Sequence, residues 1–322
     1  MHSKLIYLIW FISSLGVSQT IQKFSIDSGG ASAIAGNIQI LYTIGEVNVQ
    51  ELSAGNIQIS EGFINAELKI NINPKLFLQG PLLAPVTAGL MNDNLRSANY
   101  LPTTSPYADA ATCNASVFNV TGNNAIVDWV WIELRDPSDN TKVISGKSAL
   151  VQRDGDVVSL DGLSNVTINA AQNYYYVVVK HRNHIGAMSS GVIALSQTPV
   201  TIDFTNNGFS TFGSNAQVVL PSGSKALWAG DVNNNGSIKF SGTNNDVNAI
   251  KDFILNDGSN VLNFITFSST GYLNEDVDLN GIARFSGAPN DSNKIKDNIL
   301  AHPGNILNFP TYTIITTVPP AN

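Results

Sequence analysis

The sequence predicts a mainly β protein that ends in a small tandem repeat with short helices. Apolar and polar residues alternate with period two in several segments before residue 180, which is typical of strands. Only 13% of the residues are charged and 43% are hydrophobic, which argues against a disordered or coiled-coil chain. Residues 231–255 recur 45 positions later as residues 276–300, which indicates a duplicated structural unit.

Residues 1–18 have the three-part pattern of an export signal. A short, weakly basic start precedes an apolar run over residues 5–15, and Gly16 and Ser18 place small residues before a cut at Gln19. The run is shorter than the roughly 20 residues that span a bilayer, although an N-terminal anchor or a buried strand is an alternative. We therefore predict a secreted protein, extracellular or on the outer cell surface, with no membrane span in the mature chain.

Residues 19–69 contain a short internal sequence repeat. The segment Ala35–Ile40 (AGNIQI) recurs as Ala54–Ile59, and each copy leads into alternating apolar and polar residues. Gly-Asn before such alternation is typical of a turn followed by a strand, so this region is predicted to be a small β-hairpin module.

Residues 70–206 carry the longest strand patterns, at 75–79, 125–134 and 174–179. Strands at short, regular spacing without a helical period predict an antiparallel β-sandwich, immunoglobulin-like or prealbumin-like. Residues 207–230 are predicted to be a linker, in which Trp228 packs where the next module begins.

Residues 231–322 form the tandem repeat. The segments 231–255 and 276–300 are identical at 15 of 25 positions, and the following turn also recurs, as Asn260–Phe264 and Asn305–Phe309. Apolar residues at helical spacing predict short helices over 246–255 and 291–300.

Each repeat begins with the first half of an EF-hand-like Ca²⁺ loop, because oxygen side chains stand at positions 1, 3 and 5 and glycine at position 6. Position 12, usually a carboxylate, is glycine in both copies, so we assign the Asp four residues later as the closing ligand. The predicted ligands are Asp231, Asn233, Asn235, the carbonyl of Ser237 and Asp246 in the first loop, and Asp276, Asp278, Asn280, the carbonyl of Ile282 and Asp291 in the second.

These ligands are all oxygen atoms, which suits Ca²⁺, and neither loop contains Cys or His. A single such loop could be an Asn- and Gly-rich turn, but two copies with the same spacing predict two calcium sites. The third carboxylate, Asp278, predicts tighter binding at the second site.

The paired loops resemble a dockerin module, the calcium-binding docking unit of secreted bacterial polysaccharide-degrading proteins, over about residues 226–314. They depart from it by the four-residue insertion and by Phe240-Ser241 and Phe285-Ser286 at the partner-recognition positions. Through segments such as 152–156 and 181–184, the wider chain resembles Bacteroidetes-type secreted haemagglutinin-like or dockerin-repeat proteins. This resemblance implies a secreted or surface protein and transfers no catalytic residues.

Other candidate sites are weaker. His181 and His184 are three apart, and strand spacing places them on opposite faces, so a polar cluster at a strand end is favoured over a metal site. Arg153, Asp154 and Asp156 could pair with this cluster. Trp129 and Trp131 share one strand face, where a sandwich core or an inter-module seam is favoured over a sugar-stacking platform.

The net charge of −7 leaves no basic surplus for phosphates, so nucleic-acid binding is not expected. The favoured hypothesis is a non-catalytic calcium-binding modular protein with an adhesion or assembly role, whose partner is a protein or a cell-surface glycan. The alternatives are a carbohydrate-binding component of an extracellular polysaccharide-degradation system and a hydrolase with an unrecognised site.

Overall fold

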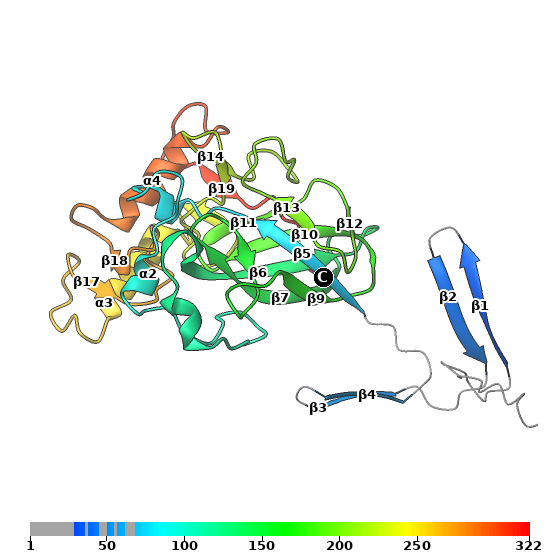
Figure 1. The fold of residues 1–322 in the computed structure, drawn as a ribbon. Helices are drawn as coiled ribbons and strands as arrows, with labels where there is room; N and C mark the ends of the chain where they lie inside the picture. The colour runs from blue at the N-terminus through cyan, green and yellow to red at the C-terminus, as the bar shows by residue number, and fades with distance from the viewer. Residues whose placement is uncertain (1–28, 36–37, 45–49, 55–56, 62–67) are drawn as a thin grey trace, which may run out of the picture. The chain divides into compact units, whose positions relative to one another are not determined.

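The computed structural model describes residues 29–35, 38–44, 50–54, 57–61 and 68–322 (Figure 1). These residues form a mainly β protein with several antiparallel sheets, as the sequence predicts. The chain divides into two compact units, Met1–Glu67 and Leu68–Asn322. The predicted export signal, residues 1–18, lies outside the described residues.

The first unit contains two antiparallel strand pairs. Strand β1 (Gly29–Ala35) pairs with β2 (Ile38–Ile44), and β3 (Gln50–Ala54) pairs with β4 (Ile57–Glu61). In both pairs the echoed Ala-Gly-Asn-Ile segment joins the two strands, so the same local sequence stands at the same place in each. Both pairs are antiparallel, and the hairpin module over residues 19–69 stays a prediction.

The larger unit is built around a six-stranded antiparallel sheet with the order β11-β10-β6-β7-β8, in which β12 also pairs with β10. Its strands are β6 (Ile126–Arg135), β7 (Val143–Gln152), β8 (Val157–Val158), β10 (Asn173–His181), β11 (His184–Met188) and β12 (Ile193–Leu195). The two inner strands β6 and β10 correspond to the strongest strand patterns of the sequence. All but one residue of β6 are buried, which explains its nearly continuous apolar composition.

A second sheet has the order β13-β5-β9, formed by β13 (Val200–Asp203), β5 (Lys69–Lys75) and β9 (Val166–Asn169). Strands β5 and β9 are antiparallel, but β13 and β5 are parallel, so the prediction of wholly antiparallel strands is wrong at this pair. The alternating burial of β5 places Ile70 and Ile72 in one hydrophobic core with residues of the larger sheet. The sandwich classification stays a prediction.

Short helical turns fill the connection between β5 and β6. They are η1 (Gly80–Leu82), α2 (Asn94–Ser97), η2 (Ala115–Asn119) and η3 (Gly122–Asn124). The predicted linker contains two short paired strands, β14 (Val218–Val219) and β15 (Lys225–Ala226). Trp228, 1% exposed, follows them and lies in the core of the repeats, where its indole nitrogen donates to the carbonyl of Asn215 over 3.0 Å.

Each repeat is a loop, a short strand, a helix and a second short strand. The elements are β16 (Ser237–Lys239), α3 (Asp246–Asn256) and β17 (Ser268–Thr270), then β18 (Ile282–Arg284), α4 (Asp291–Ala301) and β19 (Thr313–Ile315). The strands pair across the repeats: β17 pairs with β18, and β19 returns to pair with β16. Because each repeat completes the sheet of the other, the two repeats form one interlocked body.

Both helices begin at the predicted Asp and bury the predicted apolar stripe. Ile250 and Ile254 of α3, and Ile295 and Ile299 of α4, are fully buried in one core. That core also contains Ile185 of β11, so the repeats pack against the larger sheet within the unit Leu68–Asn322. Among the described residues, no helix is both long and apolar enough to cross a membrane.

Candidate metal centre

The first loop is organised around Asp231, which is only 3% exposed. One carboxylate oxygen accepts from the backbone N–H of Asn235 over 2.9 Å, and the other accepts from that of Gly236 over 3.0 Å. Gly236 has a φ of 80°, a conformation that disfavours other residues. The loop therefore folds back on its first residue through the turn predicted from the sequence.

Asp246, the predicted closing residue, reaches the same loop from the first turn of α3. Its Oδ1 accepts from the N–H of Val232 over 3.0 Å, and its Oδ2 accepts from the N–H of Lys239 over 2.8 Å. The inserted segment ends at Asn245, whose side chain accepts from the N–H of Asn248 and caps the helix. The four-residue insertion thus leaves the carboxylate of Asp246 beside the loop.

The second loop repeats this geometry 45 residues later. Asp276 accepts from the N–H groups of Asn280 over 3.0 Å and Gly281 over 2.7 Å. Asp291 accepts from the N–H groups of Val277 over 2.9 Å and Arg284 over 2.8 Å. The identical residues of the two copies therefore make equivalent contacts, which explains why the sequence pattern is shared.

The remaining predicted ligands lie along the same loops. Asn235 accepts from the N–H of Ser237 over 2.9 Å, and Asn280 accepts from the N–H of Ile282 over 2.8 Å. Ser237 and Ile282 are the first residues of β16 and β18, as expected for position 7. Asn233 also accepts from the N–H of Asn235 over 3.2 Å.

Ligand atoms of three carboxylates converge at the second loop. One oxygen each of Asp276, Asp278 and Asp291 lies within 4.8 Å of the others. The first loop has only two carboxylates, because Asn233 stands at the position of Asp278. The Oδ1 atom of Asp278 is buried and has no hydrogen-bond partner in the described residues.

A lysine accompanies the extra carboxylate. The ammonium of Lys294 in α4 contacts Asp278, and it lies 3.5 Å from Asp291. The equivalent residue of the first repeat is Ala249. The second loop therefore has three carboxylates and one ammonium group. The ammonium group of Lys294 offsets the advantage in calcium affinity that the third carboxylate would give.

Burial raises the pKa of the loop carboxyls. The pKa of Asp231 is raised to about 6 by burial, despite its backbone hydrogen bonds. The pKa of Asp246 is raised to about 7 by burial and by the charge of Asp231. Burial also raises the pKa of Asp291 to about 6 and that of Asp276 well above its ordinary value. Each loop therefore holds negative charges at an energetic cost that a cation would relieve.

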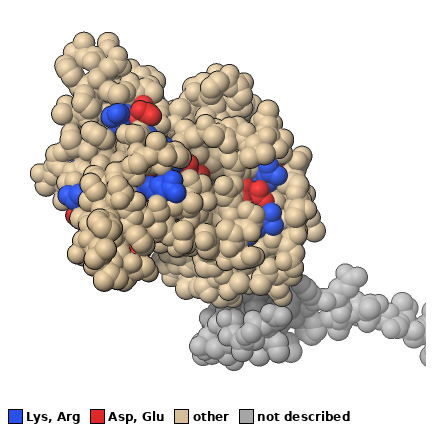
Figure 2. All heavy atoms as spheres, turned by 90° about the vertical axis from the view of Figure 1, so that its left-hand side faces the viewer, with Lys and Arg blue, Asp and Glu red and all other residues tan. Residues whose placement is uncertain are grey.

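The donor set fits a hard divalent cation. Carboxylate, amide and peptide oxygens are the ligands that Ca²⁺ prefers, and the unpartnered oxygen of Asp278 is one such atom. Few Lys, Arg, Asp or Glu side chains mark the face of the molecule seen in Figure 2, and red appears there only in small patches. Asp231, Asp246, Asp276 and Asp291 are themselves buried.

A second cluster of buried charges surrounds Asp128 of β6, which is fully buried. Its carboxylate accepts from His181 and from Arg182, each over 3.1 Å, and from the hydroxyl of Tyr272 over 2.6 Å. Burial alone would raise the pKa of Asp128, but Arg182 and His181 lower it to about 2. This cluster supplies its own positive charge.

Two interpretations of the weaker candidates are wrong. His181 and His184 do not lie on opposite faces, because β10 ends at His181 and β11 begins at His184, and their Nδ1 atoms are 2.9 Å apart. The segment 153–156 does not pair with them: Arg153 lies 3.6 Å from Asp93, and Asp156 pairs with Lys75 over 2.7 Å.

The tryptophans of β6 do not form an exposed platform. Trp129 is fully buried, and its indole nitrogen donates to the carbonyl of Pro102 over 2.9 Å. Trp131 is half-buried, with its ring centroid 5.9 Å from that of Tyr107. A register shift between Ile126 and Asp128 accompanies this arrangement, so simple alternation does not describe the strand.

Comparisons of the chain with protein-family models, with curated proteins and with solved structures found no match.

Sequence reasoning missed Lys294 and the Asp128 cluster. A comparison of the two repeats could have found Lys294. The second repeat has Asp278 where the first has Asn233, and it also has Lys294 where the first has Ala249. The Asp128 cluster had none, because Asp128, Arg182 and Tyr272 come together only through the packing of distant segments.

Proposed function

We propose that this chain is a secreted or cell-surface, non-catalytic calcium-binding modular protein, in which two Ca²⁺ ions hold the tandem repeats in shape for an adhesion or protein-assembly role. The observation that carries this proposal is the contrast between buried carboxylates. Asp128 has Arg182 beside it and a lowered pKa, whereas Asp231 and Asp246 have raised pKa values. A divalent cation would supply the charge that the loops lack.

Each ion would be held by one loop and the helix that follows it. The first loop would use Asp231, Asn233, Asn235, the carbonyl of Ser237 and Asp246. The second would use Asp276, Asp278, Asn280, the carbonyl of Ile282 and Asp291, with Lys294 displaced from Asp278. Bound calcium would supply positive charge and fix the loop geometry.

The assembly role is supported by the resemblance to dockerin modules and by a duplicated, exposed apolar turn after each helix. Asn260 shapes the first turn, since its side chain donates to the carbonyls of Ile254 and Phe264 over 2.8 and 3.0 Å. Asn305 does the same in the second turn over 2.8 and 2.9 Å. The exposed apolar residues are Val261, Leu262, Phe264, Ile306, Leu307 and Phe309. Apolar side chains presented in this way favour a protein partner.

The alternative as a carbohydrate-binding component has less support. Its proposed stacking platform needs Trp129 at the surface, and Trp129 is fully buried. A catalytic role for the histidine pair is likewise disfavoured, because His181 and His184 are each 2% exposed. We therefore propose no second function.

The calcium proposal is tested by thermal unfolding of the full chain with excess Ca²⁺ and with a chelator. A ligand that binds only the folded state stabilises it by about 2.7 kcal/mol for each site at a hundredfold excess over Kd. The parent protein should therefore melt at a higher temperature with Ca²⁺. The variant with Asp231→Ala and Asp276→Ala should lose this difference.

The matched control is Asp252→Ala with Asp297→Ala, which removes two exposed carboxylates at equivalent positions of α3 and α4. The control should keep the calcium response of the parent. A double loop variant that responds to calcium like the parent would show that the ligand assignment is wrong. For the assembly role, Leu262→Ser with Leu307→Ser should weaken capture of protein partners from a surface extract while the calcium response remains.

A further inference from the structure

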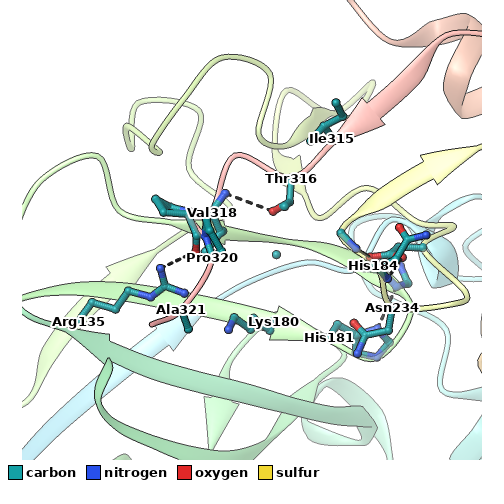
Figure 3. A pocket seen from close by; sticks show the side chains of 15 residues that line it. Arg135, Lys180, His181, His184, Asn234, Ile315, Thr316, Val318, Pro320 and Ala321 are labelled. Carbon is teal, nitrogen blue, oxygen red and sulfur yellow. Dashed lines mark hydrogen bonds between the residues drawn. The ribbon is translucent and has the colours of Figure 1, made fainter. Parts of the chain in front are cut away.

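The turn between β10 and β11 is a junction between the larger sheet and both calcium loops. Arg182 and Asn183 form this turn, and Asn183 is fully buried. In Figure 3, His181 and His184 on either side of the turn lie near Asn234 of the first loop. These three residues line one cavity of about 550 Å³.

Asn183 contacts the first ligand residue of each loop. Its carbonyl oxygen accepts from the N–H groups of Gly230 over 3.0 Å and Asp231 over 3.2 Å. Its side-chain nitrogen donates to the carbonyls of Asn274 over 2.9 Å and Asp276 over 2.8 Å. One residue therefore positions the start of the first loop with its backbone and the start of the second loop with its side chain.

A chain of hydrogen bonds fixes the orientation of the Asn183 amide. The N–H of Gly80 donates to Nε2 of His184 over 3.1 Å, so the hydrogen of this neutral ring is on Nδ1. That Nδ1 atom lies 2.8 Å from the side-chain oxygen of Asn183 and 2.9 Å from Nδ1 of His181, so its hydrogen is shared between these two acceptors. The amide nitrogen is left to face the two loop carbonyls, so the amide cannot turn over without losing both sets of bonds.

Arg182 holds the approach to the second loop. Its guanidinium donates to Asp128 and to the carbonyl of Leu273, and it lies 4.2 Å from the ring centroid of Tyr272. Tyr272 in turn donates to Asp128 over 2.6 Å. The segment that enters the second loop is therefore fixed to β6 by a buried ion pair.

We propose that Asn183 is a positioning residue that couples the two calcium sites, so that calcium at one loop raises the affinity of the other. This inference rests on the proposed function. Calcium fixes Asp276, whose carbonyl accepts from the side chain of Asn183. The ordered Asn183 then accepts from the N–H groups of Gly230 and Asp231 with its own carbonyl. The first loop therefore loses less conformational entropy when it binds its ion. By linkage, the first loop acts on the second to the same extent.

The coupling is measured by a double-mutant cycle in calcium titrations of the full chain. Asp276→Ala disables the second loop, and the calcium affinity of the first loop should fall by about fivefold or more, the lower end of ordinary coupling. The Asn183→Ala background removes the side-chain bonds to Asn274 and Asp276. In this background, Asp276→Ala should lower the calcium affinity of the first loop by less than about twofold. An undiminished effect of Asp276→Ala in that background would overturn the proposal.

A second measurement does not depend on an Asn183 variant. In Asp246→Ala only the second loop is expected to bind calcium. Added calcium should then slow hydrogen exchange at the amides of Gly230 and Asp231, which donate to Asn183. Unchanged exchange at both amides contradicts coupling. A parent protein that binds no calcium refutes the proposed function, whereas two independent sites in the parent refute only the coupling.

Discussion

The molecule buries carboxylates in two ways, and the two regions differ in whether a cationic side chain lies beside the carboxylates. Asp128 lies in the larger sheet with Arg182 and His181, and its pKa is lowered to about 2. Among the described residues, no cationic side chain hydrogen-bonds to Asp231 or Asp246 of the first loop, and their pKa values are raised to about 6 and about 7. Residues of equal burial thus differ because one region contains its own counter-charge.

The second loop differs from the first by one additional carboxylate and one additional cation. It adds Asp278, but it also adds Lys294, which contacts Asp278 and lies near Asp291. The two loops therefore have the same formal net charge when the ammonium group of Lys294 is added to the carboxylates of the second loop. The comparison predicts that Lys294, and not the number of carboxylates alone, decides which loop binds calcium more tightly.

The largest expected effect is at the Asp128 cluster. Asp128→Ala leaves the buried guanidinium of Arg182 without its carboxylate partner. Removing one partner of a buried ion pair costs about 3–5 kcal/mol of unfolding free energy. Denaturant unfolding should show this loss to a similar extent with calcium and with a chelator. A loss comparable to that of the exposed-residue control Asp252→Ala would mean that the cluster does not join the sheet to the repeats.

The single loop variants should have the next largest effect, and only when calcium is present. Asp231→Ala and Asp276→Ala each remove one site, worth about 2.7 kcal/mol at a hundredfold excess of calcium. Each should remove at least half of the calcium-dependent stabilisation, because coupling through Asn183 also weakens the remaining site. Melting curves with calcium and with chelator measure the difference. If either variant keeps the full response, its loop is not a site.

Lys294→Ala should tighten the second site. Removing the ammonium frees Asp278 and Asp291 for the ion, and the affinity of this loop should rise about tenfold, equivalent to about 1.4 kcal/mol. Lys296→Ala, a charge removed two residues away on α4, is the matched control. The reverse change, Ala249→Lys, should weaken the first site. Calcium titration of the three variants checks the predicted order of their calcium affinities. Equal effects of Lys294→Ala and Lys296→Ala would show that Lys294 does not act through its contacts with Asp278 and Asp291.

The two regions should also respond to pH with opposite signs. The pKa of Asp128 is lowered in the folded state, so its contribution is present above its ordinary value of 3.8 and is lost as the pH falls towards 2. The pKa values of Asp231 and Asp246 are raised from 3.8, so calcium-free protein should lose stability as the pH rises above about 4, and the loss should be complete once the pH has passed about 6 and 7. Chelated samples unfolded between pH 2 and 8 should therefore be most stable near pH 4. Excess calcium should remove the loss at higher pH.

The repeats were the most predictable part of the fold because their pattern is local. Spacing alone placed Asp246 and Asp291 at the starts of α3 and α4. It could not show that β17 pairs with β18 and β19 with β16, because pairing between repeats is a long-range contact. In the sheet, alternation was right about the existence of β6 and β10, but strand spacing did not apply to His181 and His184, because a two-residue turn reverses the chain between them.

The candidate site was predictable where residue type decides the chemistry. Oxygen side chains at fixed spacing predicted both loops as candidate sites, and the structure brings one oxygen each of Asp276, Asp278 and Asp291 together in the second. The role of Asn183 could not be read from the sequence, because its partners Asp231 and Asp276 are brought to it by packing.

The central claim is that the two loops take up calcium because they bury more negative charge than the chain itself balances. Isothermal titration of the full chain, freed of metal by a chelator, with Ca²⁺ tests this most directly. The account predicts two ions bound per chain, and none in the variant with Asp231→Ala and Asp276→Ala. A parent protein that binds no calcium, or a double variant that still binds two ions, would contradict it.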